Sequence, residues 1–125
     1  MLPTLLQVAL GGAIGASARF AVGVMVMRAM GPGFPLAIIA VNVLGSFLMG
    51  VFVVLAAHRG LTHLSPFVMT GILGGFTTFS AFSLEAVTLY ERGALGQAAA
   101  YVAISVVVSI AALVAGLWVA RAWVA

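Results

Sequence analysis

The sequence predicts an all-α membrane protein with four transmembrane helices, forming a single domain over residues 1–125. Of its 125 residues, 65% are hydrophobic and only 6% are charged, whereas soluble domains carry roughly a quarter charged residues. Uncharged runs recur along the chain, at 1–18, 29–58, 60–84 and 93–120. A helix needs about 20 apolar residues to cross a bilayer. Composition therefore excludes a soluble fold and leaves little chain outside the membrane.

Turn-forming segments divide these runs into helices. The segments 31–35 (GPGFP), 58–66 and 91–93 (ERG) combine glycine, proline and charged residues. We therefore expect helices near residues 4–28, 35–57, 66–90 and 94–122. The first ten residues carry no basic stretch and no convincing cleavage site, so we expect them to belong to the first helix and not to a signal peptide.

The five arginines are scattered along the chain, and no lysine is present. They form no basic patch for nucleic acid. With four spans, Arg59 and Arg121 lie on one side of the membrane, and Arg28 and Arg92 lie on the other. An excess of positive charge on one side sets orientation, and neither side has one. The tie predicts insertion in both orientations, with an antiparallel homodimer as the simplest assembly; the alternative is that other signals set one orientation.

Two polar side chains lie inside the first two spans. Arg19 is too deep in the first helix for an ordinary end anchor. Its guanidinium either snorkels to the membrane surface or faces a watery vestibule, where it would attract anions. Asn42 lies in the second helix, and its amide needs partners that lipid does not supply. It therefore either clamps a neighbouring helix or faces water.

The third helix places its least membrane-like residues, GGFTTFSAFS at 74–83, at its centre. Irregular backbone at this depth is tolerated only where it is buried in protein or lines a cavity. We expect the paired glycines to allow a break at mid-membrane, where freed carbonyls can coordinate a cation or freed N–H groups can meet an anion. The alternative is a glycine-rich packing contact in an unbroken helix.

Three phenylalanines recur at every third residue of this segment, and we expect Phe76, Phe79 and Phe82 to share roughly one face. A phenylalanine stripe in a membrane helix is normally packing. Its position beside hydroxyl groups favours a second role, because aromatic edges carry positive quadrupole density that attracts a small anion.

The fourth helix carries polar residues four apart, namely Gln97, Tyr101, Ser105 and Ser109. Serines often bond back to their own helix, but a continuous polar face favours a pore lining or a polar interface. Glu85 is the only acid well inside a span. Intramembrane ionisable residues are functional candidates, and Glu85 is a proton carrier, a partner of Arg19 or a vestibule residue. The chain has no cysteine, which excludes disulfides and thiolate metal sites.

These motifs together resemble the Fluc (CrcB) family of small bacterial fluoride channels. The resemblance rests on GGAIGASARF in the first helix, NVLGSFLMG in the second, GILGGFTTFSAFSLE in the third and the Tyr/Ser stripe in the fourth. It covers the whole chain, and the third-helix motif is highly specific. It implies a passive fluoride-selective channel in the bacterial inner membrane, built as an antiparallel dual-topology homodimer with two anion pathways in membrane lipid.

The resemblance also implies roles for single residues. The anion pathway would be formed by Asn42, Phe79, Phe82, Tyr101, Ser105 and Ser109. The backbone carbonyls of Gly74 and Thr77 would hold a structural sodium ion at the dimer two-fold axis. Arg19 and Glu85 would lie toward the vestibules. One position departs from the family, because Ala81 stands where a threonine is common, and this removes a hydroxyl from the polar track.

A small proton-coupled multidrug exporter is the main alternative, because such proteins share the size, the four helices and the dual topology. That antiporter needs a titratable carboxylate at its central site, usually in the first helix. The first helix here has no acid, and Glu85 belongs to the third. An accessory membrane subunit is a second alternative, but it would not require a mid-membrane break. The sequence therefore favours a channel, with no enzymatic activity.

Overall fold

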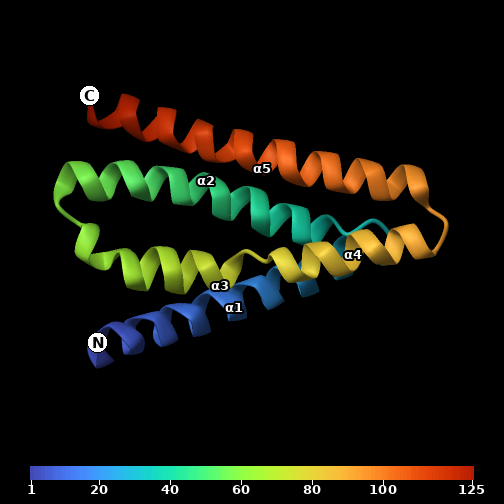
Figure 1. Cartoon of the computed structure of the whole chain (residues 1–125), viewed down its shortest axis with the longest axis horizontal. Helices are drawn as coiled ribbons and strands as arrows, with labels where there is room; N and C mark the ends of the chain where they lie inside the picture. The colour runs from blue at the N-terminus through green and yellow to red at the C-terminus, as the bar shows by residue number, and fades with distance from the viewer.

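The computed structural model describes residues 1–125 as four long helical spans joined by short links (Figure 1). The spans are α1 (Leu2–Met30), α2 (Leu36–Arg59), a composite third span (Thr62–Glu91) and α5 (Leu95–Val124). Each is long and apolar enough to cross a membrane. The prediction of four transmembrane helices is confirmed, and the protein is a multi-pass membrane protein. The largest boundary difference is at the third span, which begins at Thr62 instead of residue 66.

The third span is assembled from several helical pieces. A 3₁₀ turn, η1 (Thr62–Leu64), leads into a π-helix, η2 (Pro66–Leu73), which continues as the short α3 (Gly74–Phe76). The last piece is α4 (Phe79–Glu91). Because it combines 3₁₀, π and α segments, the third span is the only one that is not a single regular α-helix.

The predicted break in the third span is confirmed, close to the middle of that span. It consists of Thr77, with φ −86° and ψ 159°, and Thr78, with φ −154° and ψ 118°. Both residues are extended, so the helix is interrupted between α3 and α4. The paired glycines, which we expected to allow the break, come just before it, and Gly74 and Gly75 are themselves helical. Gly75 instead lies against α1, where an added Cβ would come within 2.9 Å of the Gly12 carbonyl oxygen.

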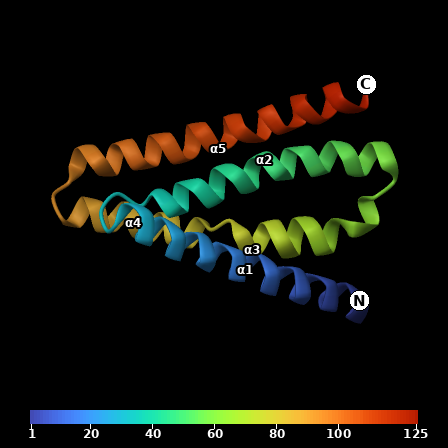
Figure 2. The same ribbon diagram turned by 180° about the vertical axis from the view of Figure 1, so that it is seen from behind.

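The spans pack mainly as two helix pairs. α1 lies along η2 and α3, while α2 lies along α5, and α4 contacts α5. Figures 1 and 2 show both chain termini and the link between α2 and η1 at one end of the molecule, with the other two links at the opposite end. Small residues bring the backbones close, as is common in membranes. A Cβ on Gly11 would lie 2.8 Å from the Gly71 Cα, and one on Gly116 would collide with the Phe47 carbonyl oxygen.

Little of the single chain is buried. Only 15 of the 125 residues are buried, and most large apolar side chains are exposed. The small core lies where α4 meets α5 and consists of Leu89, Ala98 and Tyr101, with Phe82 packed against it. Exposed apolar faces of this extent require lipid or another protein chain around them.

Candidate functional site

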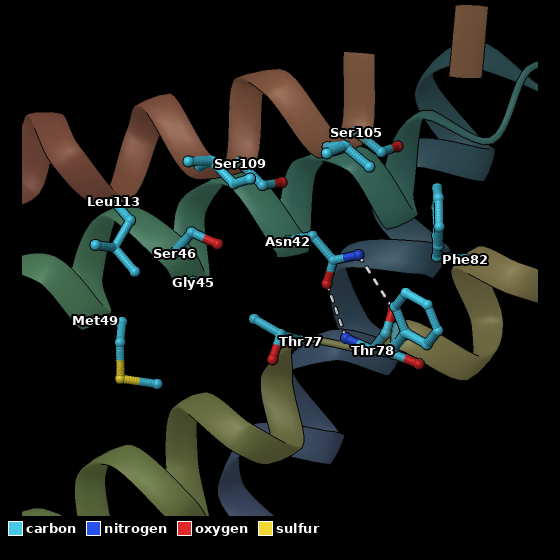
Figure 3. A pocket seen from close by; sticks show the side chains of 13 residues that line it. Asn42, Gly45, Ser46, Met49, Thr77, Thr78, Phe82, Ser105, Ser109 and Leu113 are labelled. Carbon is cyan, nitrogen blue, oxygen red and sulfur yellow. Dashed lines mark hydrogen bonds between the residues drawn. The ribbon is translucent and has the colours of Figure 1, made fainter. Parts of the chain in front are cut away.

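Asn42 binds the broken segment from the neighbouring helix α2. Its Nδ2 donates a hydrogen bond to the Thr78 carbonyl oxygen over 3.1 Å, and the Thr78 N–H donates to Asn42 Oδ1 over 2.8 Å. Figure 3 shows Asn42 reaching from α2 to Thr78 with both bonds drawn. Of the two alternatives for this side chain, the clamp between helices is therefore present. Asn42 also lines the open groove described below, so the two roles coexist.

Thr78 begins α4 as its N-cap. Its Oγ1 accepts a hydrogen bond from the Ala81 N–H over 3.1 Å, as a capping threonine does. In a continuous helix the Thr78 N–H would donate to Gly74 and the Ala81 N–H to Thr77. Both donors are directed elsewhere here, so the carbonyl oxygens of Gly74 and Thr77 lose their regular helical partners. These are the two oxygens that the family resemblance assigns to a cation.

A groove of about 400 Å³ opens between α2, α5 and the break. Its polar lining is Asn42, Ser46, Thr77, Thr78, Ser105 and Ser109, and its apolar lining includes Phe79, Phe82, Met49 and Leu113. Figure 3 shows these side chains entering the groove from three different elements. The groove therefore brings together five of the six residues predicted for the anion pathway, and Tyr101 is the exception.

Three hydroxyl groups on α5 have no hydrogen-bond partner in the chain, namely those of Tyr101, Ser105 and Ser109. Buried polar groups are usually paired, and other hydroxyls of this protein do bond back to their own helix. Thr88 Oγ1, for instance, donates to the Leu84 carbonyl over 2.7 Å. The serines of α5 do not, so the polar face predicted for the fourth helix is not an ordinary back-bonded one. Gln97, at the start of that face, is exposed and lies outside the groove.

The three phenylalanines do not form the single stripe that their spacing predicted. Phe79 is 78% exposed, and its ring centroid lies 5.6 Å from that of Phe82. Phe82 packs against Tyr101 at 5.3 Å. Phe76 does not join them, because it is buried before the break and lines no part of the groove. The three-residue spacing fails as a guide here, since Thr77 and Thr78 are extended and shift the helical phase between Phe76 and Phe79.

Arg19 lies against the break and not beside Glu85. Its Nε donates to the Gly75 carbonyl oxygen over 3.1 Å, at the end of α3, where helix carbonyls leave partial negative charge. Arg19 and Arg28 also line a second hollow of about 460 Å³ on α1. Glu85 is half-buried on α4 and lines neither hollow. The Arg19–Gly75 bond was not predicted from the sequence, because the accepting group is a backbone carbonyl.

Backbone oxygens are the available ligands for a metal at the break. The chain brings together no group of three His, Cys, Asp or Glu side chains. Carbonyls freed where a helix is broken at mid-membrane are a known type of sodium ligand, and the Gly74 and Thr77 oxygens have both lost their regular helical donors. Gly74 is exposed, and an added Cβ there would meet only the Met69 carbonyl of its own helix at 3.3 Å. The donor set at the break therefore fits a hard cation.

Two contacts of the site were not predicted from the sequence. One is the pairing of Asn42 with Thr78, and the other is the cap that Thr78 provides for α4. A threonine immediately before the first turn of a helix is a recognisable capping signal, so the cap could have been found. The partner of Asn42 could not, since it lies 36 residues away.

Comparison with known proteins gives a consistent result. The family described as CrcB-like protein, Camphor Resistance (CrcB), matches residues 6–117. A protein named fluoride-specific ion channel FluC from Ruegeria sp. (strain TM1040) is 71% identical over 122 residues, covering 97% of each chain. Proteins of the same name from Roseobacter denitrificans and Cereibacter sphaeroides are 68% and 62% identical, covering 94% and 100% of this chain and 95% and 100% of their own. The resemblance found in the sequence is confirmed, and the chain belongs to the CrcB family.

Proposed function

We propose that the protein is a passive, fluoride-selective ion channel of the bacterial inner membrane. One observation carries this proposal, namely the groove in which the Asn42 amide lies near the unpartnered hydroxyls of Ser105 and Ser109. A small, strongly hydrated anion can enter a narrow pore only if hydrogen-bond donors replace its water. The relatives named fluoride-specific ion channels point to fluoride as that anion.

The chemistry of the groove suits conduction and not only binding. Every polar residue in its lining is neutral. Conduction needs binding strong enough for entry and weak enough for exit, and neutral donors meet this condition better than a fixed cation. Phe79 and Phe82 add ring edges, which carry positive quadrupole density without a full charge.

We propose that the working unit is an antiparallel, dual-topology homodimer with two pores. The balanced arginines allow both orientations in the membrane. In a single chain the groove is open and the ring of Phe79 is largely exposed, so a second copy would close the pathway. Inverted copies would also bring their two breaks together near the two-fold axis, since each break lies near the middle of its span.

We propose further that a structural sodium ion is held at that axis by the carbonyl oxygens of Gly74 and Thr77. Both oxygens have lost their regular helical donors, and Gly74 is exposed on the outer face of the chain. When bound, sodium would supply positive charge that offsets the facing carbonyl dipoles. Arg19 and Glu85 are assigned to the aqueous vestibules, and the hollow that Arg19 shares with Arg28 supports attraction of anions there.

The lining of the groove bears on the exporter alternative and on the departure from the family pattern at Ala81. The exporter needs a titratable carboxylate at its central site, and neither Glu85 nor Glu91 lines the groove. Ala81, the departure from the family pattern, lies outside the groove of its own chain, and its N–H completes the cap of α4. The missing hydroxyl therefore takes nothing from the lining that this chain supplies.

The deciding experiment is a flux assay on the purified protein in liposomes, with a fluoride gradient and without a pH or sodium gradient. We expect fluoride efflux well above chloride efflux, since small size and strong donors favour fluoride in this groove. Liposomes without protein and liposomes with the Phe82→Ile variant serve as controls. Absence of efflux, or equal efflux of chloride, would contradict the proposal.

A further inference from the structure

We propose that Asn42 is a positioning residue that holds the third span open at its break and thereby couples the cation site to the anion groove. The hydrogen bonds of this clamp belong to the chain itself. The identity of the two ions rests on the proposed function. Asn42 would thus act on both ions from one side chain.

The contact between Asn42 and Thr78 is a complete pairing of two amide-type groups. The side chain accepts from the Thr78 N–H and donates to the Thr78 carbonyl, over 2.8 and 3.1 Å. Only asparagine and glutamine carry a donor and an acceptor in one planar amide. Leucine and an ionised aspartate have the same length but carry no donor, so neither could satisfy both backbone groups of Thr78 at once.

The clamp determines which backbone oxygens are free. An unbroken helix would use the Thr78 N–H to satisfy the Gly74 carbonyl. By taking that N–H, Asn42 removes the donor from Gly74 without leaving a backbone N–H unpaired in the membrane. The Thr78 hydroxyl does the same for Thr77 by taking the Ala81 N–H. The clamp therefore favours the broken conformation, in which both oxygens are available to a cation.

A second contact shows that the same face of α2 is shaped to receive the break. Gly45 lies three residues after Asn42, which places the two on neighbouring positions of one helix face. A Cβ on Gly45 would collide with Thr77 Cγ2 and come within 3.4 Å of the Phe76 ring. The absence of a side chain at Gly45 thus lets α2 come close enough for Asn42 to reach Thr78.

Asn42 also has one hydrogen left for the groove. Its Nδ2 carries two hydrogens, and only one of them is used by the Thr78 carbonyl. Asn42 lines the groove together with Ser105 and Ser109 (Figure 3). Loss of Asn42 should therefore affect both the cation site and the anion path, whereas loss of Ser105 should affect the anion path alone.

Hydrogen–deuterium exchange of the 74–82 segment separates these effects. It is measured on the purified full-length protein, with sodium titrated against N-methylglucamine at constant ionic strength and without fluoride. We expect Asn42→Ala to speed exchange by about tenfold or more, the effect of losing a buried hydrogen bond. The sodium concentration for half-maximal protection should rise by a similar factor. Ser105→Ala is the matched control and should behave as wild type in both measurements.

The Asn42→Asp variant separates the contact with Thr78 from the hydrogen-bond donor that Asn42 offers to the groove. Its carboxylate keeps an acceptor for the Thr78 N–H, so exchange should stay closer to wild type than in Asn42→Ala. Fluoride flux should still fall sharply, because the negative charge repels the anion. If Asn42→Ala cannot be purified, Asn42→Ser carries the same expectation, since serine is too short to make both bonds.

The exchange experiment can fail for this proposal without the protein failing as a fluoride channel, and the possible results differ. Wild-type exchange in Asn42→Ala would overturn the clamp. Faster exchange with an unchanged sodium midpoint would overturn the coupling and leave only a local contact. Protection that does not respond to sodium in the wild type would overturn the coupling and the sodium site together. Fluoride flux in liposomes, measured separately, decides whether the protein is a channel.

Discussion

The ring of Phe82 lies against the ring of Tyr101, with centroids 5.3 Å apart and planes tilted by 34°. Tyr101 is completely buried and also meets the Phe34 ring edge-on at 5.7 Å. Phe82 is therefore held in place by a fixed neighbour. Phe79 is not, because 78% of its surface is exposed and Phe82 is its only aromatic contact in the chain. The two groove phenylalanines thus differ in how firmly the single chain positions them.

Replacement of Phe82 should lower fluoride flux while the protein remains folded. Phe82→Ile keeps an apolar side chain but removes the ring edge from the groove. We expect flux in liposomes to fall several-fold, corresponding to the roughly 0.5–1.5 kcal/mol of an aromatic contact. Phe52→Ile is the control, since Phe52 lies on α2 outside the groove lining. Equal flux in both variants would mean that the Phe82 ring is packing and no more.

Replacing the serines of α5 should lower fluoride flux without lowering the stability of the protein. Ser105→Ala and Ser109→Ala each remove a buried hydroxyl that has no partner in the chain. Because no hydrogen bond is lost, the melting temperature should stay the same or rise, with a gain of up to about 1 kcal/mol. Fluoride flux should fall, since a donor is removed from the groove. Thr88→Ala is the reverse control: its hydroxyl is bonded to Leu84, so stability should drop slightly and flux should not.

Adjacent glycines of α1 should respond differently to the same substitution. A Cβ on Gly11 would meet the Phe67 carbonyl oxygen and lie 2.8 Å from the Gly71 Cα, whereas one on Gly12 meets nothing within 4 Å. Gly11→Ala should destabilise the protein by about 1–3 kcal/mol through overpacking. Gly12→Ala should be neutral or stabilising, because alanine is the better helix former. Thermal unfolding in detergent measures both, and equal melting temperatures would contradict the close α1–η2 contact.

The topology of the chain can be measured directly. If the balanced arginines allow both orientations, a tag at the C-terminus should be accessible from both sides of the membrane. Addition of two lysines to the link between α1 and α2 should bias the chain toward one orientation and reduce fluoride flux, because antiparallel pairs become rare. Coexpression of a copy biased in the opposite direction should restore flux. Labelling from one side only in the unmodified protein would exclude dual insertion.

The sequence predicted the spans and the position of the break, because both depend on composition along the chain. Charges and turn residues limit the hydrophobic runs, and the paired glycines and hydroxyl residues of GGFTTFSAFS at the centre of a span predicted an interruption there. The family motifs also predicted the groove residues on α2, α4 and α5, five of which the fold brings together.

Other features could not be predicted, for physical reasons. The backbone partners of Asn42 and Arg19 depend on how α1 and α2 approach the break, and helix periodicity does not specify this approach. Helical spacing also placed Phe76 with Phe79, since it assumes an unbroken helix. The π-helix η2 was not expected either, because its composition is that of any apolar helix.

Both ends of the chain lie at the same end of the helix bundle (Figure 1). This has a consequence for any protein in which two copies are joined into one polypeptide. A short linker from one C-terminus to the next N-terminus would return the second copy to the same side of the membrane and insert it parallel to the first. An antiparallel pair in one chain would need a linker that crosses the bilayer once more. A tandem gene with an added hydrophobic helix between its halves should therefore support transport, and one with a short soluble linker should not.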